Sequence, residues 1–229
     1  MRVTRAAIVL AGGDPVEPHL RTLLPEDAVV IAADSGVHQA ELLGLHVDYV
    51  VGDFDSADPD AVERARVAGA VVDRHPVEKD ATDLELALDV ARDRGVQRIT
   101  VVGGAGGRLD HLLANVALLA SPRFADLEID ARSGDAYLAV VQGGRPARAI
   151  VGRPGSLVTL LPMGGDASGI TTSGLQYPLD DATLRPGTSR GVSNVLVGAE
   201  GSVVLERGTL LSIQPLALDP IAVEPGGAS

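Results

Sequence analysis

The chain has 229 residues, a formal net charge of −12 and no cysteine. This acidic balance argues against a nucleic-acid surface, because such a surface needs clustered Lys and Arg to neutralise phosphates. Without cysteine, disulfide bonds and thiolate metal sites are excluded. Any metal ion would therefore be held by oxygen or imidazole ligands, which favours a hard cation.

Hydrophobic residues make up 45% of the chain and aromatic residues only 2%. This balance indicates a globular core of Ala, Val, Leu and Ile. No run approaches the roughly 18 apolar residues of a membrane span, and the first apolar stretch, residues 6–11, is too short for the core of a signal peptide. We expect a cytoplasmic protein that contacts neither nucleic acid nor membrane.

The N-terminal part alternates short aliphatic runs with longer amphipathic stretches, which is typical of βα units around a parallel sheet. We predict an α/β domain over residues 1–134, with an open, mainly parallel sheet flanked by helices. The predicted strands are residues 6–11, 28–33, 47–51, 70–73, 98–102 and 127–131.

Two stretches of this domain carry clear helix signals. Residues 58–69 begin with Asp58 at an N-cap, continue with proline at the first helical position and end at a glycine. Residues 82–95 begin with a capping box of Thr82 and Glu85 and also end at a glycine. Both stretches are predicted to be helices.

After about residue 134, short strand-like runs separated by Gly and Pro replace the helical period. This pattern is typical of an antiparallel sandwich or barrel. We predict a smaller C-terminal antiparallel β-sandwich domain over residues 135–229. Arg207 and Gly208 are expected at a hairpin tip, and residues 219–229 are expected to form a loose tail.

Carboxylates follow four successive predicted strands of the α/β domain. Ligands of an open parallel sheet bind beyond the carboxyl ends of its strands, where loops lead into helix N-termini. Capping explains any one of these residues, but it explains the whole set less well. They are Asp34 after the second strand, Asp53 and Asp55 after the third, Asp80 and Asp83 after the fourth, and Asp110 after the fifth.

The carboxylates of Asp53 and Asp55 flank Phe54, so in an extended segment both would point the same way. Like charges at such a spacing repel and raise one another's pKa unless a cation neutralises them. Mg²⁺ suits the site because it takes few carboxylates and leaves coordination positions open for phosphate oxygens. We therefore expect Mg²⁺ among these side chains.

Basic side chains and a glycine-rich turn lie in the same loops. Lys79 precedes Asp80, and Arg108 lies two residues before Asp110. Taken singly, each is better explained as a surface charge beside its neighbouring Asp. The turn over residues 103–107 has backbone N–H groups suited to phosphates, although it matches neither a Walker A sequence nor a strict dinucleotide fingerprint. Together these parts indicate a phosphoryl-transfer site.

Four acidic motifs in this order resemble those of the thiamine pyrophosphokinase (thiamine diphosphokinase) family. They are "ADSG", "VGDFDS", "KDATDLELAL" and "GGRLDHLLAN". The C-terminal segments "GITTSGLQYPL" and "GVSN" resemble the β-domain of that family. The resemblance extends from about residue 6 to residue 215.

This resemblance implies a homodimer that binds ATP and Mg²⁺ in the α/β domain and holds thiamine at the subunit interface, against the β-sandwich of the partner. The implied reaction transfers the diphosphoryl group of ATP to the thiamine hydroxyl and releases thiamine diphosphate and AMP. The chain would accordingly be an Mg²⁺-dependent diphosphotransferase.

The resemblance also implies roles for the residues that match the motifs. Asp53, Asp55 and Asp83 would bind Mg²⁺ and form the catalytic set together with Asp110, our candidate acceptor of the alcohol proton. The residues implied in ATP binding are Asp34, Lys79, Asp80, Gly104, Gly107 and Arg108. Those implied in thiamine binding are Ser193, Asn194 and Tyr177, the last at a position where many relatives have Trp.

Three other functions fit the acidic residues alone. A pyrophosphokinase that acts on a hydroxymethyl-pterin would share the α/β domain, but the C-terminal motifs weigh against it. A non-catalytic module that binds thiamine or a nucleotide is a second alternative, although such relatives usually lose metal ligands. A magnesium-dependent phosphohydrolase would need no alcohol acceptor.

Overall fold

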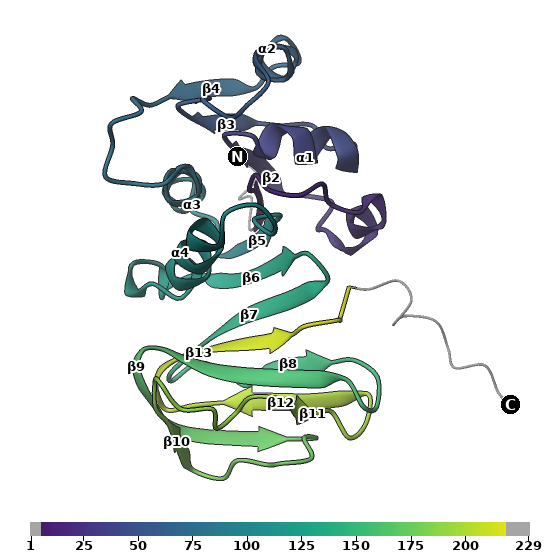
Figure 1. Cartoon of the computed structure of the whole chain (residues 1–229), viewed down its shortest axis with the longest axis vertical. Coiled ribbons are helices and arrows are strands. Elements are labelled where there is room, and N and C mark those ends of the chain that lie inside the picture. The colour runs from purple at the N-terminus through teal and green to yellow at the C-terminus, as the bar shows by residue number, and fades with distance from the viewer. Residues whose placement is uncertain (1–5, 219–229) are drawn as a thin grey trace, which may run out of the picture. The chain divides into compact units, whose positions relative to one another are not determined.

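The computed structural model describes residues 6–218, which form two compact units (Figure 1). The first comprises the described part of Met1–Leu118 together with Asp126–Gly134. The second comprises Leu119–Ala125 together with the described part of Asp135–Ser229. The tail expected over residues 219–229 lies outside the described part of the chain. Within residues 6–218, no helix is long and apolar enough to cross a membrane.

The first unit contains an entirely parallel sheet in the order β4-β3-β2-β1-β5-β6, which confirms the predicted α/β class. The sequence predicted each strand to within about two residues. Buried parallel strands are continuous aliphatic runs, and only β4, at the end of this strand order, is largely exposed among them. Their bounds are β1 Ala6–Leu10, β2 Val29–Ala33, β3 Tyr49–Gly52, β4 Val71–Arg74, β5 Arg98–Val102 and β6 Glu128–Ser133.

Helices connect these strands (Figure 1). Both predicted helices form with the predicted caps. Asp58 Oδ1 accepts from the backbone N–H of Asp60 at 3.1 Å, and Thr82 Oγ1 accepts from that of Glu85 at 3.2 Å. The helices are α1 Gly36–Leu43, α2 Pro59–Val67, α3 Asp83–Asp93 and α4 Leu109–Leu119, with 3₁₀ turns at Pro18–Leu23 and Pro122–Phe124.

The order of the strands places a topological switch point between β1 and β5. The chain leaves β1 toward β2, β3 and β4 on one side and returns to β5 on the other side. Backbone hydrogen bonds join the loops that follow these two strands: Asp14 N–H donates to Ala105 O at 2.8 Å, and Gly104 N–H donates to Gly12 O at 2.8 Å. Open α/β sheets bind their ligands at such a point.

The second unit is antiparallel, with strand order β7-β13-β9-β12-β8, and β10 and β11 also pair with β9. The buried faces enclose a core of Val, Leu, Ile and Ala. The antiparallel part of the fold prediction is thereby confirmed. The bounds are β7 Ala136–Gln142, β8 Arg148–Val151, β9 Leu157–Ser173, β10 Ala182–Leu184, β11 Asn194–Val195, β12 Glu200–Val204 and β13 Arg207–Gln214.

The predicted hairpin tip at Arg207 and Gly208 is wrong, because both residues belong to β13. Strands β12 and β13 flank β9 and pair with different parts of it. Gly208 has φ +90°, and a Cβ there would lie 2.5 Å from Asp166 O. This glycine therefore allows close contact with β9 rather than a chain reversal.

The buried face of β9 gives a direct stability prediction. Leu160 is fully buried, whereas Leu157, on the same strand, is 41% exposed. Leu160→Ala should lower the free energy of unfolding by about 2–5 kcal/mol, because it leaves a cavity in the core of the second unit. Leu157→Ala should cost no more than about 1 kcal/mol. Urea unfolding of the two variants measures the difference, and equal losses would contradict the assigned core.

Candidate active site

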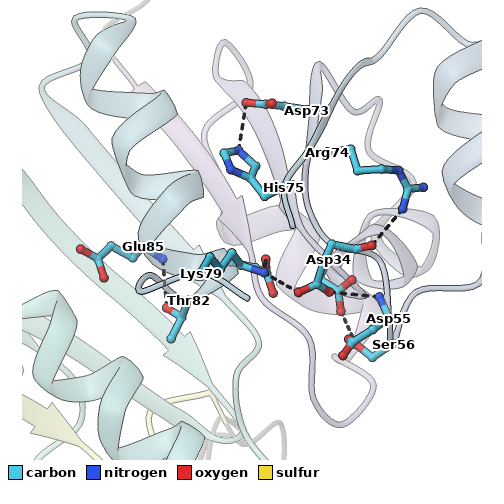
Figure 2. Close-up of polar contacts among 11 residues, drawn as sticks. Asp34, Asp55, Ser56, Asp73, Arg74, His75, Lys79, Thr82 and Glu85 are labelled. Atoms are coloured by element: carbon cyan, nitrogen blue, oxygen red, sulfur yellow. Dashed lines mark hydrogen bonds and ion pairs between the residues drawn. The ribbon is translucent and has the colours of Figure 1, made fainter. Parts of the chain in front are cut away.

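Three carboxylates converge beyond the ends of β2 and β3. Asp34, Asp53 and Asp55 each offer one oxygen atom, and these atoms lie within 4.8 Å of one another. Figure 2 shows Asp34 and Asp55 of this group. We call these three residues the acidic cluster. The sequence predicted Asp53, Asp55 and Asp83 for the metal, and two of these three residues belong to the acidic cluster.

Asp34 is held in an unusual conformation at the end of β2. Its φ is +46°, a left-handed value that Asp tolerates better than most residues. Its backbone N–H donates to Val51 O at 2.8 Å, and its Oδ2 accepts from the hydroxyl of Ser56. Its Oδ1 is buried and has no hydrogen-bond partner among the described residues. A buried, unpaired carboxylate oxygen is costly, and a bound cation would remove that cost.

Asp53 and Asp55 approach each other across a turn, not along the extended segment that the sequence suggested. Phe54 between them has φ +65°, and Asp55 N–H donates to Asp53 Oδ1 at 3.2 Å. Arg74, at the end of β4, donates to Asp53 O at 2.9 Å and places its guanidinium 4.5 Å from the centre of the Phe54 ring. A cation–π contact and a hydrogen bond therefore hold the turn.

Gly52 leaves room for these carboxylates. A Cβ on Gly52 would lie 3.0 Å from Asp83 Oδ1 and 3.2 Å from Asp34 Cβ. Its φ of +150° is also one that residues with a side chain rarely adopt. A larger residue at this position would therefore push Asp34 and Asp83 apart.

Lys79 is the cation nearest to this group. Its ammonium donates to Asp53 Oδ2 and lies 3.0 Å from Asp83 Oδ1. The side chains of Asp53 and Lys79 are 8% and 13% exposed, so water screens this contact little. The hydrogen bond from Lys79 lowers the pKa of Asp53. Burial alone would lower the pKa of Lys79, but its bonds to Asp53 and Asp83 outweigh burial and raise it.

Asp83 behaves differently from Asp53, because burial, the largest cause, raises its pKa and the net shift stays upward despite its contact with Lys79. The nearby negative charges of Asp53 and Asp34 act in the same direction as burial. One ammonium group therefore does not neutralise all the carboxylates gathered here. The acidic cluster offers only oxygen ligands, and one of its oxygens, Asp34 Oδ1, is buried and unpaired. This arrangement fits a hard divalent cation such as Mg²⁺.

The loops at the switch point bring backbone unusually close to backbone. A Cβ on Gly13 would lie 2.3 Å from Ala105 O, and one on Gly103 would lie 2.4 Å from Ala11 O. The predicted ATP-binding residues Gly104 and Gly107 have φ values of +76° and +61°. These glycines are therefore required by the conformation of the loop, which exposes the backbone at Gly106 and Gly107.

Gln39 in α1 fixes the first of these loops. Its buried side chain accepts from Val16 N–H at 3.0 Å and donates to Asp14 O at 3.1 Å. Residue spacing did not point to Gln39, Arg74 or Ser56. Ser56 could have been suspected from its place in "GDFDS", but Gln39 and Arg74 bind backbone more than 20 residues away and carry no local signal.

Arg108 and Asp110 pair with each other and not with the acidic cluster. Arg108 donates to the Asp110 carboxylate at 2.6 and 3.2 Å, and both side chains are more than 60% exposed. The hydrogen bond from Arg108 lowers the pKa of Asp110 to about 2. Asp80 is exposed on the loop before α3, and within the described residues no hydrogen bond or ion pair joins it to the acidic cluster.

The residues expected to bind thiamine lie together in the second unit. Tyr177 is 62% exposed, whereas Asn194 is only 5% exposed. The Asn194 side chain bonds both the N–H and the C=O of Tyr177, at 3.0 and 2.7 Å. Ser193 has φ +56°, and its backbone N–H donates to Thr159 Oγ1 at 3.1 Å.

The Arg108–Asp110 pair gives a prediction about pH. The folded-state pKa of Asp110 lies below its ordinary value of 3.8, so the pair stabilises the protein above that value and is lost as the pH falls toward 2. The side-chain carboxyl resonance of Asp110, followed by NMR, should barely move between about pH 5 and 3. In Arg108→Gln it should shift through that range. Arg98→Gln, which removes a distant ion pair with Glu128, is the control. An unchanged Asp110 curve in Arg108→Gln would contradict the pairing.

Comparison with known proteins agrees with this geometry. The model "Thiamin pyrophosphokinase, catalytic domain" matches residues 20–131, and "Thiamin pyrophosphokinase, vitamin B1 binding domain" matches residues 150–210. A curated thiamine pyrophosphokinase of Bacillus subtilis is 27% identical over 90% of this chain and 96% of its own length.

Solved structures extend the similarity to the fold. The thiamine pyrophosphokinase structure from Bacillus subtilis has a TM-score of 0.79 at 27% identity and covers 91% of this chain and 98% of that one. The one from Geobacillus thermodenitrificans has a TM-score of 0.75 at 30% identity and covers 91% and 96%. The Candida albicans structure, with a TM-score of 0.77 at 14% identity over 92% and 89%, shows the shared fold alone. Both halves of this chain thus match in order, and the chain belongs to the thiamine pyrophosphokinase family.

Proposed function

We propose that this protein is a thiamine diphosphokinase that transfers the diphosphoryl group of ATP to the hydroxyl of thiamine and releases thiamine diphosphate and AMP. The observation that carries the proposal is the acidic cluster at the carboxyl ends of β2 and β3, in a chain that matches both the catalytic and the vitamin B1 binding domain models. Phosphoryl transfer needs mainly positioning and neutralisation of charge, which these residues are suited to supply.

Mg²⁺ is the metal that we propose for the acidic cluster. Asp53 and Asp55 would hold it together with Asp34, which belongs to the same cluster and has an unpaired buried Oδ1. The bound ion would supply neutralisation of the ATP phosphate charge. Asp83 then keeps its contact with Lys79 and orients that ammonium toward the site.

ATP is the proposed co-substrate, and its phosphates are assigned to the switch point. The exposed backbone of Gly106 and Gly107 offers a place for anionic oxygens, with Gly104 shaping the turn. Arg108 is a cation on the same loop. Asp80, exposed before α3, is assigned to the nucleotide by resemblance. Because ATP is the co-substrate, we place the reaction in the cytoplasm.

Asp110 is the proposed acceptor of the alcohol proton. While Arg108 binds it, the carboxylate is a weak base, because the pair lowers its pKa to about 2. If Arg108 turns to the phosphates of ATP, Asp110 loses that bond and becomes more basic. The alcohol proton leaves late in a loose phosphoryl-transfer transition state, so a carboxylate within hydrogen-bond reach suffices.

The thiazolium charge of thiamine suits an acidic protein with an exposed aromatic ring. We assign Tyr177 to a stacking contact with thiamine, and Ser193 and Asn194 to the same binding region. The protein is proposed to act as a homodimer with thiamine at the subunit interface. Leu109 and Leu113 of α4 are 67% and 60% exposed, which is consistent with an apolar surface that a second copy covers. Sedimentation velocity would measure that state.

The proposed reaction predicts that AMP is released only when thiamine is present. Purified protein with ATP and Mg²⁺ should release AMP when thiamine is present and little without it. Replacing thiamine by a hydroxymethyl-pterin should give no AMP. AMP formed only with the pterin, or phosphate released without any acceptor, would reject the proposal in favour of a related pyrophosphokinase or a phosphohydrolase.

A change of one carboxylate tests the acidic cluster. Asp55→Asn keeps the shape of the side chain but removes a charge from the proposed metal site, so AMP release should fall at least about 100-fold. The fall should be partly reversed by a higher Mg²⁺ concentration. Asp93→Asn, which changes a carboxylate 75% exposed at the end of α3, should leave the rate within about twofold. Thermal unfolding without metal verifies that both variants fold. A near wild-type rate for Asp55→Asn would exclude the assigned role.

A further inference from the structure

Asn194 is a buried polar side chain whose hydrogen bonds all go to neighbouring backbone. Its Oδ1 accepts from Tyr177 N–H at 3.0 Å and from Val195 N–H at 2.8 Å, and its Nδ2 donates to Tyr177 O at 2.7 Å. An amide oxygen accepts two hydrogen bonds, so the capacity of Oδ1 is filled. The second Nδ2–H lies on a residue that is only 5% exposed, so Asn194 has little left to offer a ligand directly.

These bonds continue a pairing between two segments of the second unit. Leu175 pairs with Leu196, and Gln176 N–H donates to Val195 O at 2.8 Å. At the next step, Tyr177 N–H and C=O meet the side chain of Asn194 instead of a strand backbone. The side chain thus acts as an extra peptide unit and fixes Tyr177 where regular pairing ends.

The result is a fixed backbone beneath a free ring. The peptide of Tyr177 is clamped on both its N–H and its C=O, while the residue as a whole is 62% exposed. An exposed aromatic ring on a rigid backbone loses little conformational freedom when a flat ligand stacks on it. Without these bonds the Tyr177 ring would still be present, but its orientation would no longer be fixed.

We propose that Asn194 is a positioning residue that acts through Tyr177 and sets the affinity for the pyrimidine-bearing substrate without touching it. This inference rests on the proposed function, since it takes thiamine as the molecule that stacks on Tyr177. It assigns to Asn194 a role different from the direct contact that the sequence motif suggested.

The expected effect is on the KM for thiamine. Asn194→Ala removes all three bonds and should raise that KM about tenfold, with kcat and the KM for ATP within about twofold. Asn194→Asp keeps an acceptor for Tyr177 N–H and Val195 N–H, but it places a carboxylate oxygen against Tyr177 O where the 2.7 Å bond was, so it should also raise that KM.

Thr172→Val is the matched control. Thr172 is buried, and its Oγ1 accepts from Leu179 N–H at 2.8 Å, two residues beyond Tyr177. This change removes a buried bond to the same segment but leaves the Tyr177 peptide clamped. It should destabilise the protein, as Asn194→Ala does, while the KM for thiamine stays within about twofold. An equal rise in KM for both variants would mean that Asn194 has a structural role only, and would overturn the inference.

A double-mutant cycle separates action through Tyr177 from direct contact. In a Tyr177→Leu background, Asn194→Ala should change the KM for thiamine by less than about twofold, because the ring that it positions is gone. A tenfold rise in that background as well would show direct contact. An unchanged KM in Asn194→Ala alone would also overturn the inference.

Fluorescence distinguishes failure of this inference from failure of the proposed function. The chain has no tryptophan, so Y177W introduces a single reporter at the proposed stacking position. Thiamine should quench its emission, with about tenfold weaker binding when Asn194→Ala is added. Quenching without AMP formation would overturn the proposed reaction alone. If AMP forms normally and thiamine binds Y177W equally well with and without the added Asn194→Ala change, only the positioning role would be overturned.

Discussion

The central constraint on the candidate site is that the fold holds several carboxylates close together although they repel one another. Asp34, Asp53 and Asp55 meet within 4.8 Å, and Asp83 contacts Lys79, which also binds Asp53. Lys79 offsets part of the negative charge, but the pKa of Asp83 stays raised and one oxygen of Asp34 stays unpaired. The site is therefore organised around a positive charge that the protein itself supplies only in part.

Close backbone packing allows this arrangement. Gly52 leaves space between Asp34 and Asp83, and the glycines after β1 and β5 let two loops lie against each other at the switch point. This packing requires strained backbone at Asp34 and Phe54, which both have positive φ. Such positions persist only where surrounding contacts determine them, as Ser56 and Arg74 do here.

Polar side chains that clamp distant backbone recur in both units. Gln39 holds the loop after β1, Arg74 holds the turn at Phe54, and Asn194 holds the peptide of Tyr177. Each of these side chains forms hydrogen bonds to main-chain groups near a proposed binding residue. This arrangement keeps loops rigid where regular strand pairing has ended, and rigid loops lose less freedom when a ligand binds.

The sequence by itself determined the class of the fold, the strands and capped helices of the first unit, and the placement of carboxylates at one edge of the sheet. These features follow from local periodicity and from the rule that parallel strands end at one edge. The sequence did not determine the path of β9 or the place of Gly208, since antiparallel pairing partners are distant in sequence. Only the tertiary structure decided that Asp34 joins the acidic cluster, that Lys79 binds Asp53 and Asp83, and that Asn194 binds Tyr177. Contacts of this kind depend on the turn geometry of each loop and, for Asn194, on segments far apart in the chain, which residue spacing alone does not encode.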